Sequence, residues 1–418
     1  MKFDVIIAGG GLSGLVTGVT LQKKGLRTLM VSSGESALHF FSGSFDFLGC
    51  LEDGTSVVHP LECLDRLDER HPYRIIGKDL LRRYADECKD LLSLTGVQVH
   101  GDIQKNHFRL TSLGSVKPTW LSLSGIPQIP GAFKKGDRVL IVQFRGYLDF
   151  FPSFIAQALG RMGVETRIHD VSLDALCGLR RNPSEMRSVQ ISRQMDDENT
   201  FRSLENALRS ACRDSDMVIL PSVFSLENQS SRLSRLKATL GTSVCVLPTM
   251  SLSVTGSDIQ LRLQRCYEDL GGTLLFGDTV QRMELDKDRV SALYTANHGD
   301  EPFESDVLVL ATGSFFSNGL SSSRSQIVEP LMGLDVITPG QRSEWFSQDL
   351  FSPQPYMRSG VKYTDEFRAM KNGVALENVY VCGGLLGGRD VLLMGSGGGV
   401  ALMTALHVSE LVSRYHFS

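Results

Sequence analysis

The chain opens on FDVIIAGGGLSG, residues 3–14, and this stretch decides the fold. Residues 5–8 form a short apolar run, and Gly9, Gly11 and Gly14 follow it with the spacing G-x-G-x-x-G. In such a turn the first glycine permits a tight bend, the second lets the backbone approach a phosphate, and the third lets a helix pack closely on the strand. The stretch therefore predicts a phosphate-binding turn between a strand and a helix.

The residues after this turn complete a βαβ unit. Leu15, Val19 and Leu21 have helical spacing up to a basic last turn and a glycine at residues 23–25, and residues 29–31 form a second buried strand. Unbroken apolar runs are typical of parallel strands covered on both faces. We therefore expect a Rossmann-like α/β fold in which the helix N-terminus attracts an anionic group. The residues expected to hold it are Gly9, Gly10, Gly11, Leu12, Ser13 and Gly14.

The bulk composition limits the classes of function. A length of 418 residues allows two domains, and a net charge of -4 with a pI near 6.2 gives no reason to expect a nucleic acid partner. No uncharged apolar stretch approaches the roughly 18 residues of a membrane span, so we expect a cytoplasmic protein. The eight cysteines form no C-x-x-C pair, which predicts neither a metal site nor an iron–sulfur cluster on this chain.

A second α/β pattern occupies the middle of the chain. Residues 139–142 and 217–221 are strand-like, and residues 154–162 have helical periodicity. We therefore expect a discontinuous cofactor-binding domain of residues 1–65 and 250–418, with an inserted α/β cap domain of residues 66–249.

Two further glycine segments indicate a flavin. Residues 309–313, VLATG, end a strand in the manner of flavoproteins in which the chain passes beside the cofactor. Residues 381–384, VCGG, precede GSGGG at 395–399, a glycine loop that enters a helix and can direct N–H groups at the flavin pyrimidine. Small residues at 42–44 would allow a loop to cross the flavin ring. These segments predict contacts from Ser42, Gly43, Ser44, Ala311, Thr312, Gly313, Gly383, Gly384, Gly397, Gly398 and Gly399.

One element of a dinucleotide site is missing. Asp or Glu usually ends the second strand and binds an adenosine ribose, but here Ser32 and Ser33 occupy that place and Glu35 comes too late. We include both serines among the cofactor residues. The adenosine half of a dinucleotide is thus poorly supported, which favours FMN with FAD as the alternative.

The motifs in combination resemble those of the B subunit of anaerobic glycerol-3-phosphate dehydrogenase, over nearly the whole chain. The segments that carry the resemblance are residues 3–14, 36–44, 311–316, 329–330, 333–336 and 397–400. The resemblance implies oxidation of sn-glycerol 3-phosphate to dihydroxyacetone phosphate in glycerol catabolism, with electrons passed to a quinone and finally to fumarate or nitrate in anaerobic respiration.

The same resemblance implies partners. It implies FMN on this chain, an FAD-bearing catalytic partner (the A subunit) as the other half of a heterodimer, and an iron–sulfur partner (the C subunit). The chain would then attach peripherally, through a partner, to the cytoplasmic face of the inner membrane.

Catalytic residues are less clearly indicated than the cofactor site. Hydride transfer from an alcohol to a flavin needs a base, and a phosphate-bearing substrate needs a cationic anchor. His39, Arg358, Arg389 and His407 are candidates, each of which could also be a structural residue. Two other functions stay open: a stand-alone flavoenzyme of the fumarate-reductase type, and a flavin electron-relay subunit without substrate chemistry.

Overall fold

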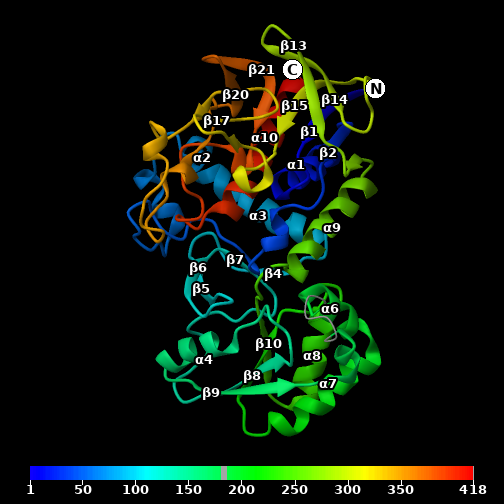
Figure 1. Cartoon of the computed structure of the whole chain (residues 1–418), viewed down its shortest axis with the longest axis vertical. Coiled ribbons are helices and arrows are strands. Elements are labelled where there is room, and N and C mark those ends of the chain that lie inside the picture. Colours follow the sequence, from blue (N-terminus) through cyan, green and yellow to red (C-terminus); the bar gives the residue numbers. More distant parts are fainter. Residues whose placement is uncertain (180–185, 418) are drawn as a thin grey trace. The chain divides into compact units, whose positions relative to one another are not determined.

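The computed structural model describes residues 1–179 and 186–417, which form two compact units (Figure 1). The first unit contains residues 1–37, 46–91 and 260–418, and the second contains residues 38–45 and 92–259. Each unit is an α/β structure with its own sheet of largely parallel strands.

The N-terminal βαβ unit is confirmed. Strand β1 (Lys2–Ala8) is followed by helix α1 (Leu12–Lys23) and strand β2 (Thr28–Ser32). The two strands pair in parallel from Val5 opposite Thr28 to Ala8 opposite Val31. Their carboxyl ends therefore lie side by side, with the glycine turn directly after β1.

The first unit is built on an eight-stranded mixed sheet. Strands β12, β2, β1 and β15 are parallel, β14 and β13 add antiparallel strands at one edge, and β21 pairs in parallel with the carboxyl end of β15. The predicted strands near residues 307–310 and 379–382 are β15 and β21. The bounds are β12 (Thr273–Phe276), β13 (Val280–Asp286), β14 (Arg289–Thr295), β15 (Phe303–Leu310), β20 (Arg368–Lys371) and β21 (Val374–Val381).

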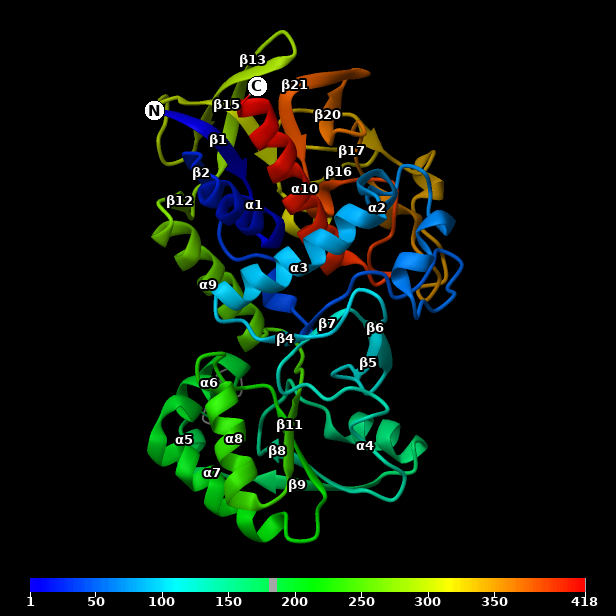
Figure 2. The same cartoon turned by 180° about the vertical axis from the view of Figure 1, so that it is seen from behind.

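Two largely buried helices pack together in the first unit. Helix α1 is buried over most of its length, and it contacts α10 (Gly397–Phe417), as Figure 2 shows. A helix that is apolar on nearly all sides needs cover on all sides, which the sheet and α10 supply. The amphipathic helix α3 (Lys78–Leu94) belongs to the same unit, and the short helix α2 (Pro72–Ile76) contacts α10.

Residues 66–91, which we expected in the insertion, belong to the first unit. Tyr84 of α3 donates a hydrogen bond to Glu410 of α10 at 2.7 Å. Leu81 and Tyr84 of α3 are buried. The local sequence pattern does not show against which unit of the protein these side chains pack. Helix α9 (Val254–Asp269) leads from the second unit back to the first.

The second unit contains a four-stranded parallel sheet in the order β11-β10-β8-β9. The central strands β8 and β10 are apolar and buried, whereas the edge strand β9 is polar and half exposed, as edge strands usually are. The predicted strands at 139–142 and 217–221 and the helix near 154–162 are confirmed. The bounds are β8 (Arg138–Phe144), β9 (Glu165–Val171), β10 (Met217–Pro221), β11 (Ser243–Leu247), α4 (Pro152–Arg161), α5 (Asp174–Cys177), α6 (Ser188–Asp196), α7 (Glu198–Ala211) and α8 (Gln229–Leu240).

Short antiparallel strands complete both units. In the second unit β3 (Ser44–Phe45), β7 (Leu121–Leu123) and β4 (Val99–His100) form one small sheet, and β5 (His107–Leu110) pairs with β6 (Val116–Thr119). In the first unit β16 (Ser321–Ser322) pairs with β17 (Ile327–Val328), and β18 (Val336–Ile337) pairs with β19 (Gly360–Val361).

Candidate functional site

The turn after β1 can only be made by glycine at its first position. Gly9 has a φ of +117°, and its N–H donates to the Val31 carbonyl at 2.8 Å. A Cβ at Gly9 would overlap the carbonyl of Ala311, which belongs to the neighbouring strand end. Because L side chains rarely adopt this φ and no space exists for one, the turn depends on Gly9.

The other two glycines of the motif have different surroundings. A Cβ at Gly14 would overlap the Gly9 carbonyl, so this glycine allows α1 to pack against the turn. A Cβ at Gly11 would have the Ser36 Cβ as its nearest neighbour at 3.7 Å, which leaves the backbone open. Gly11 thus provides the open approach that a phosphate needs.

The start of α1 supplies backbone donors. The first helical hydrogen bond runs from the Leu15 N–H to the Gly11 carbonyl at 2.9 Å, and the N-cap residue, Gly11, has no side chain that could cap the free amides. The amides of Leu12, Ser13 and Gly14 precede that bond and have no partner within the helix. Together with the helix dipole they fit the phosphate of a nucleotide cofactor.

The Ala-Thr-Gly segment lies beside this turn. The Ala311 N–H donates to the Ala8 carbonyl at 2.8 Å, which fixes the end of β15 next to the end of β1. The hydroxyl of Thr312 is buried without a hydrogen-bond partner among the described residues, and Gly313 has a φ of +80°. A buried unsatisfied hydroxyl at this point is consistent with a ligand that the sheet end receives.

The first C-terminal glycine pair joins the same place. The Cys382 N–H donates to the Leu310 carbonyl at 3.1 Å, and a Cβ at Gly383 would overlap the side chain of Ser13. A Cβ at Gly384 would lie 3.7 Å from the Gly313 Cα. Three glycine segments far apart in the sequence therefore meet at the carboxyl ends of β1, β15 and β21.

The second C-terminal glycine group begins α10. Gly397 is open on its Cβ side, and Gly398 follows it as the second residue of the helix. Gly399 donates its N–H to the Asp46 carbonyl at 2.8 Å, and a Cβ there would overlap the Tyr73 hydroxyl. The small size of Gly399 therefore serves contact with a neighbouring segment of the protein.

The end of β2 is occupied by small polar residues. The Ser32 hydroxyl donates to the Gly34 carbonyl at 3.1 Å, and Ser33 is exposed. A Cβ at Gly10 would overlap the Ser32 side chain, so Gly10 and Ser32 are in close contact. Ser32 thus lies against the glycine turn itself.

The loop of Ser42, Gly43 and Ser44 lies in the second unit, as does His39. Arg109, which the sequence analysis did not single out, donates to Ser44 Oγ at 2.6 Å and to Ser42 Oγ at 2.8 Å. The guanidinium thus holds both serines, and Gly43 between them has a φ of +84°. His39 Nδ1 lies 3.5 Å from the Ser257 hydroxyl.

The remaining catalytic candidates differ sharply in environment. Arg358 is half exposed and forms an ion pair with Glu52 at 3.1 Å, whereas Arg389 is buried. His407 lies inside α10, 3.0 Å from the Tyr84 hydroxyl, and burial lowers its pKa to about 4. His407 is therefore neutral near pH 7, and its contact with Tyr84 indicates a role in helix packing.

Sequence reasoning also overlooked the neighbours of Arg389. Arg389 interacts electrostatically with His71, Tyr73 and Tyr363, which all belong to the first unit. The His-Pro-Tyr triplet at residues 71–73 carried a signal, because a polar residue before proline is typical of a helix N-cap. His71 is indeed the N-cap of α2.

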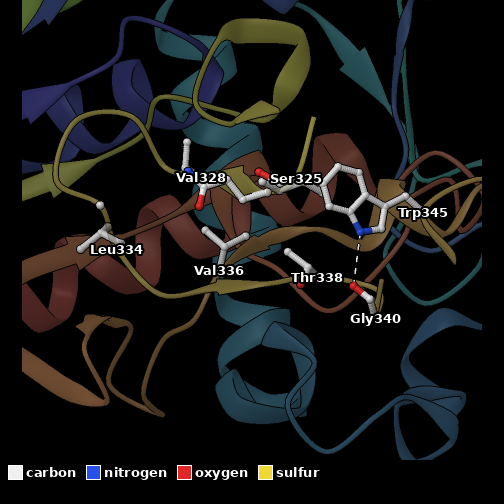
Figure 3. Close-up of a pocket in the computed structure, with 10 residues that line it drawn as sticks. Ser325, Val328, Leu334, Val336, Thr338, Gly340 and Trp345 are labelled. Atoms are coloured by element: carbon white, nitrogen blue, oxygen red, sulfur yellow. Dashed lines mark hydrogen bonds between the residues drawn. The ribbon is translucent and has the colours of Figure 1, made fainter. Parts of the chain in front are cut away.

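The first unit also contains a cavity of ≈ 280 Å³ formed by segments 325–328 and 333–340 together with Trp345 (Figure 3). Trp345 Nε1 donates to the Gly340 carbonyl at 3.4 Å. None of the predicted cofactor residues lines this cavity.

Comparison with known proteins agrees with the glycine geometry. A family model described as an FAD binding domain matches residues 4–400, so the protein is a flavoprotein of the Rossmann-like α/β type. The B subunit of anaerobic glycerol-3-phosphate dehydrogenase from Yersinia enterocolitica is 41% identical over 418 residues, which cover 99% of this chain and 98% of the relative. The corresponding subunit from Aliivibrio fischeri is 35% identical, over 99% of this chain and 95% of the relative. The chain belongs to this family of B subunits.

Solved structures resemble the chain only distantly. Glycine oxidase from Bacillus cereus has 10% sequence identity and a TM-score of 0.35, with 99% of this chain and 96% of that chain covered. L-proline dehydrogenase from P. horikoshii has 10% sequence identity and a TM-score of 0.34, with 99% of this chain and 94% of that chain covered. Similarity at this level supports no argument about function.

No helix within residues 1–179 and 186–417 is both long and apolar enough to cross a membrane.

Proposed function

We propose that the chain is the flavin-dependent subunit of an anaerobic glycerol-3-phosphate dehydrogenase that oxidises sn-glycerol 3-phosphate to dihydroxyacetone phosphate and passes the electrons to a quinone. The observation that carries this proposal is the full-length similarity to the Yersinia enterocolitica B subunit at 41% identity. The glycine segments at Gly9, Ala311 and Gly383 support it, since they meet at one sheet end. A flavin held there would accept the hydride of the alcohol carbon.

We further propose FMN as the cofactor, with FAD as the alternative that the family description names. The end of β2 has no carboxylate for an adenosine ribose. Asp278, on the loop after the adjacent strand β12, is another carboxylate near this sheet edge. It already accepts the N–H groups of Thr279 at 2.8 Å and Asn297 at 3.0 Å, so it is not a good ligand for the ribose. Mass spectrometry of the flavin released on denaturation tests the proposal, and release of FAD alone would contradict it.

The proposed site residues are those of the three meeting glycine segments of the first unit, together with Ser32, Ser33 and the start of α10. The proposal assigns the phosphate to Gly9–Gly14 and the pyrimidine edge of the flavin to the N–H groups near Gly383, Gly384 and Gly397–Gly399. Backbone donors fit both tasks, because both groups carry negative charge when the flavin is reduced.

The decisive experiment is anaerobic reduction of the bound flavin by sn-glycerol 3-phosphate. Loss of the flavin absorbance in the isolated chain supports substrate oxidation on this subunit. Loss only after addition of a partner subunit supports an electron-relay role. Reduction by a dicarboxylate or an amino acid instead of the phosphate ester would favour a stand-alone enzyme of the fumarate-reductase type.

We propose the FAD-bearing catalytic partner (the A subunit) as the other half of a heterodimer, with an iron–sulfur partner (the C subunit) that attaches the complex to the cytoplasmic face of the inner membrane. The relatives are named as a subunit, which supports an assembly. In the first unit Phe346, Leu350 and Phe351 are 55%, 80% and 95% exposed. Several large apolar side chains on one short loop favour burial against another protein. We expect Phe351→Ser with Leu350→Ser to weaken co-purification with the FAD-bearing partner, without loss of flavin.

A further inference from the structure

Arg389 is a buried cation whose hydrogen-bonding capacity is only partly used. Its side chain is 4% exposed and lies on the loop after β21. Nη1 donates to the Gly387 carbonyl at 3.1 Å, and Nη2 makes a long hydrogen bond to the Gly383 carbonyl at 3.5 Å. The buried Nε has no hydrogen-bond partner within residues 1–179 and 186–417. One donor of the guanidinium fork is thus left for another acceptor.

Arg389 forms no ion pair with an acid in the part of the first unit that the structure describes, and the buried carboxylate of the adjacent Asp390 accepts the N–H groups of Leu392 and Leu393 instead. There, the ionisable groups that favour its charged form are the phenols of Tyr363 and Tyr73, and burial opposes it. Burial also raises the pKa of both phenols, which keeps them neutral. A guanidinium stays protonated even where burial lowers its pKa, and a buried cation without a counter-charge is strongly unfavourable. A bound anion would supply the missing charge.

His71 provides a second unused donor near this cation. It is 4% exposed, and its Nδ1 accepts the N–H of Tyr73 at 3.1 Å. Burial and the charge of Arg389 lower the pKa of His71, so the ring is neutral and its proton is on Nε2. That nitrogen is buried and has no hydrogen-bond partner in the described part of the chain. Tyr363 lies near both residues: its hydroxyl donates to the carbonyl of Arg70, the residue before His71, at 2.8 Å, and its phenol interacts electrostatically with Arg389.

The pair is close to the glycine segments of the flavin site. The Gly383 carbonyl accepts from Arg389, and Gly383 itself is in contact with Ser13 at the start of α1. The hydroxyl of Ser359 is a further buried group that no described residue hydrogen bonds, and it lies on the segment whose Arg358 carbonyl accepts from Gly388 at 2.8 Å. The unused donors thus lie on segments that adjoin the proposed position of the flavin.

We propose that Arg389 Nε and His71 Nε2 bind the phosphate group of the substrate. Two fixed N–H donors and one uncompensated positive charge match an oxyanion, and a phosphate monoester is the oxyanion that the proposed function requires. The inference rests on that proposed function for the identity of the ester. Bound in this way, the phosphate neutralises the buried guanidinium and positions the alcohol carbon of the substrate relative to the flavin.

Binding of inorganic phosphate to the flavin-loaded full chain tests the inference by calorimetry. Arg389→Met removes the charge, and His71→Asn keeps an oxygen that can cap α2 while it removes the Nε2 donor. We expect the Kd for phosphate to rise at least about 10-fold in Arg389→Met and about 3-fold in His71→Asn. Arg66→Met is the matched control, because Arg66 is half exposed and pairs with Asp53 at 3.5 Å, and its Kd should stay within about 2-fold of the wild type.

Several results would overturn the inference. They are an unchanged Kd in both variants, the absence of phosphate binding by the wild type, or Arg389-dependent binding of succinate without binding of phosphate. If Arg389→Met does not fold, Arg389→Lys, which keeps the charge but loses the planar fork, should still weaken binding. Equal reduction of the flavin by sn-glycerol 3-phosphate in Arg389→Met and in the wild type would refute this substrate-phosphate site and leave the proposed function intact. Arg389-dependent phosphate binding without any reduction by sn-glycerol 3-phosphate would refute the proposed function and support the site.

Discussion

Both units contain a crossover from a buried parallel strand to a helix, but the two turns differ in what they can bind. In the first unit β1 leads through Gly9–Gly11 directly into α1, whose first residue is Leu12. In the second unit β8 ends at Phe144, and residues 145–151 follow before α4 begins at Pro152. Proline at that position has no N–H to donate, and Phe151 is a bulky N-cap. A βαβ topology alone therefore does not make a phosphate site; small residues and unused amides at the helix start do.

The largest expected effect is at Gly9. Gly9→Ala would force an L side chain to a φ of +117° and into the Ala311 carbonyl, so we expect flavin affinity to fall ~100-fold or more. Flavin fluorescence after dialysis measures the loss. Gly136→Ala is the control: its φ is +89°, but no described atom outside its own neighbours lies within 4 Å of its Cβ. If both variants kept the flavin equally, the β1–α1 turn would not hold the phosphate of the cofactor.

Leu12→Pro sharpens the comparison, because it gives α1 the first residue that α4 already has. Gly11 has φ -82° and ψ -174°, which a following proline tolerates, so α1 should still form. One amide donor is lost, and we expect about 10-fold weaker flavin binding by fluorescence titration. Pro152→Ala restores an amide at the start of α4 and should leave flavin affinity unchanged. Wild-type affinity in Leu12→Pro would show that the Leu12 amide does not contact the cofactor.

A smaller effect is expected where the turn faces the end of β2. Ser33→Glu introduces, on an exposed residue, a carboxylate that can accept hydrogen bonds from the hydroxyls of an adenosine ribose. We expect the ratio of FAD to FMN affinity to rise about 3-fold to 10-fold, the value of one charge-assisted hydrogen bond at a partly exposed site. Competitive titration with both flavins gives this ratio. Ser33→Gln is the isosteric control, and an unchanged ratio in the glutamate variant would indicate that no adenosine half reaches this strand end.

The smallest effect separates the stability of the first unit from its cofactor binding. Burial lowers the pKa of His407 to about 4, below the 6.5 of an unfolded histidine. Below pH 6.5 the unfolded chain therefore binds a proton at His407 that the folded chain does not bind. The free energy of unfolding consequently decreases as the pH is lowered, until His407 also titrates in the folded chain near pH 4. Allowing for partial exposure, we expect a loss of about 1 kcal/mol between pH 7.5 and pH 5. Urea unfolding of wild type and His407→Gln measures it, and equal pH dependence of the two would contradict this assignment.

The N-terminal βαβ unit was predictable because its signals are local. Apolar runs, helical spacing and glycine spacing lie within residues 3–31, and each acts on its own element. The strands at 139–142, 217–221 and 307–310 were predictable for the same reason. The unit to which residues 66–91 belong was not, because it depends on contacts such as that of Tyr84 with Glu410 of α10, 326 residues away in the sequence.

The difference between Arg358 and Arg389 shows most clearly what could not be predicted from the sequence. Both are arginines on glycine-containing or polar loops of the C-terminal region, and the sequence offered no reason to prefer one. Burial against Tyr73 and Tyr363 and the nearby His71 set Arg389 apart, whereas Glu52 pairs with Arg358. Long-range packing determines burial and charge partners, and local residue patterns do not record it.

The sequence by itself determined the α/β fold of the first unit, the glycine turn at Gly9–Gly14 and the family, because backbone conformation and short-range periodicity encode them. Only the tertiary structure decided that Ala311 and Gly383 adjoin that turn and that Arg389 is buried without an ion pair to an acid among the described residues. The physical reason is that a turn is fixed by the conformations its own residues can adopt. An electrostatic environment is instead the sum of groups that the fold brings together from distant parts of the chain.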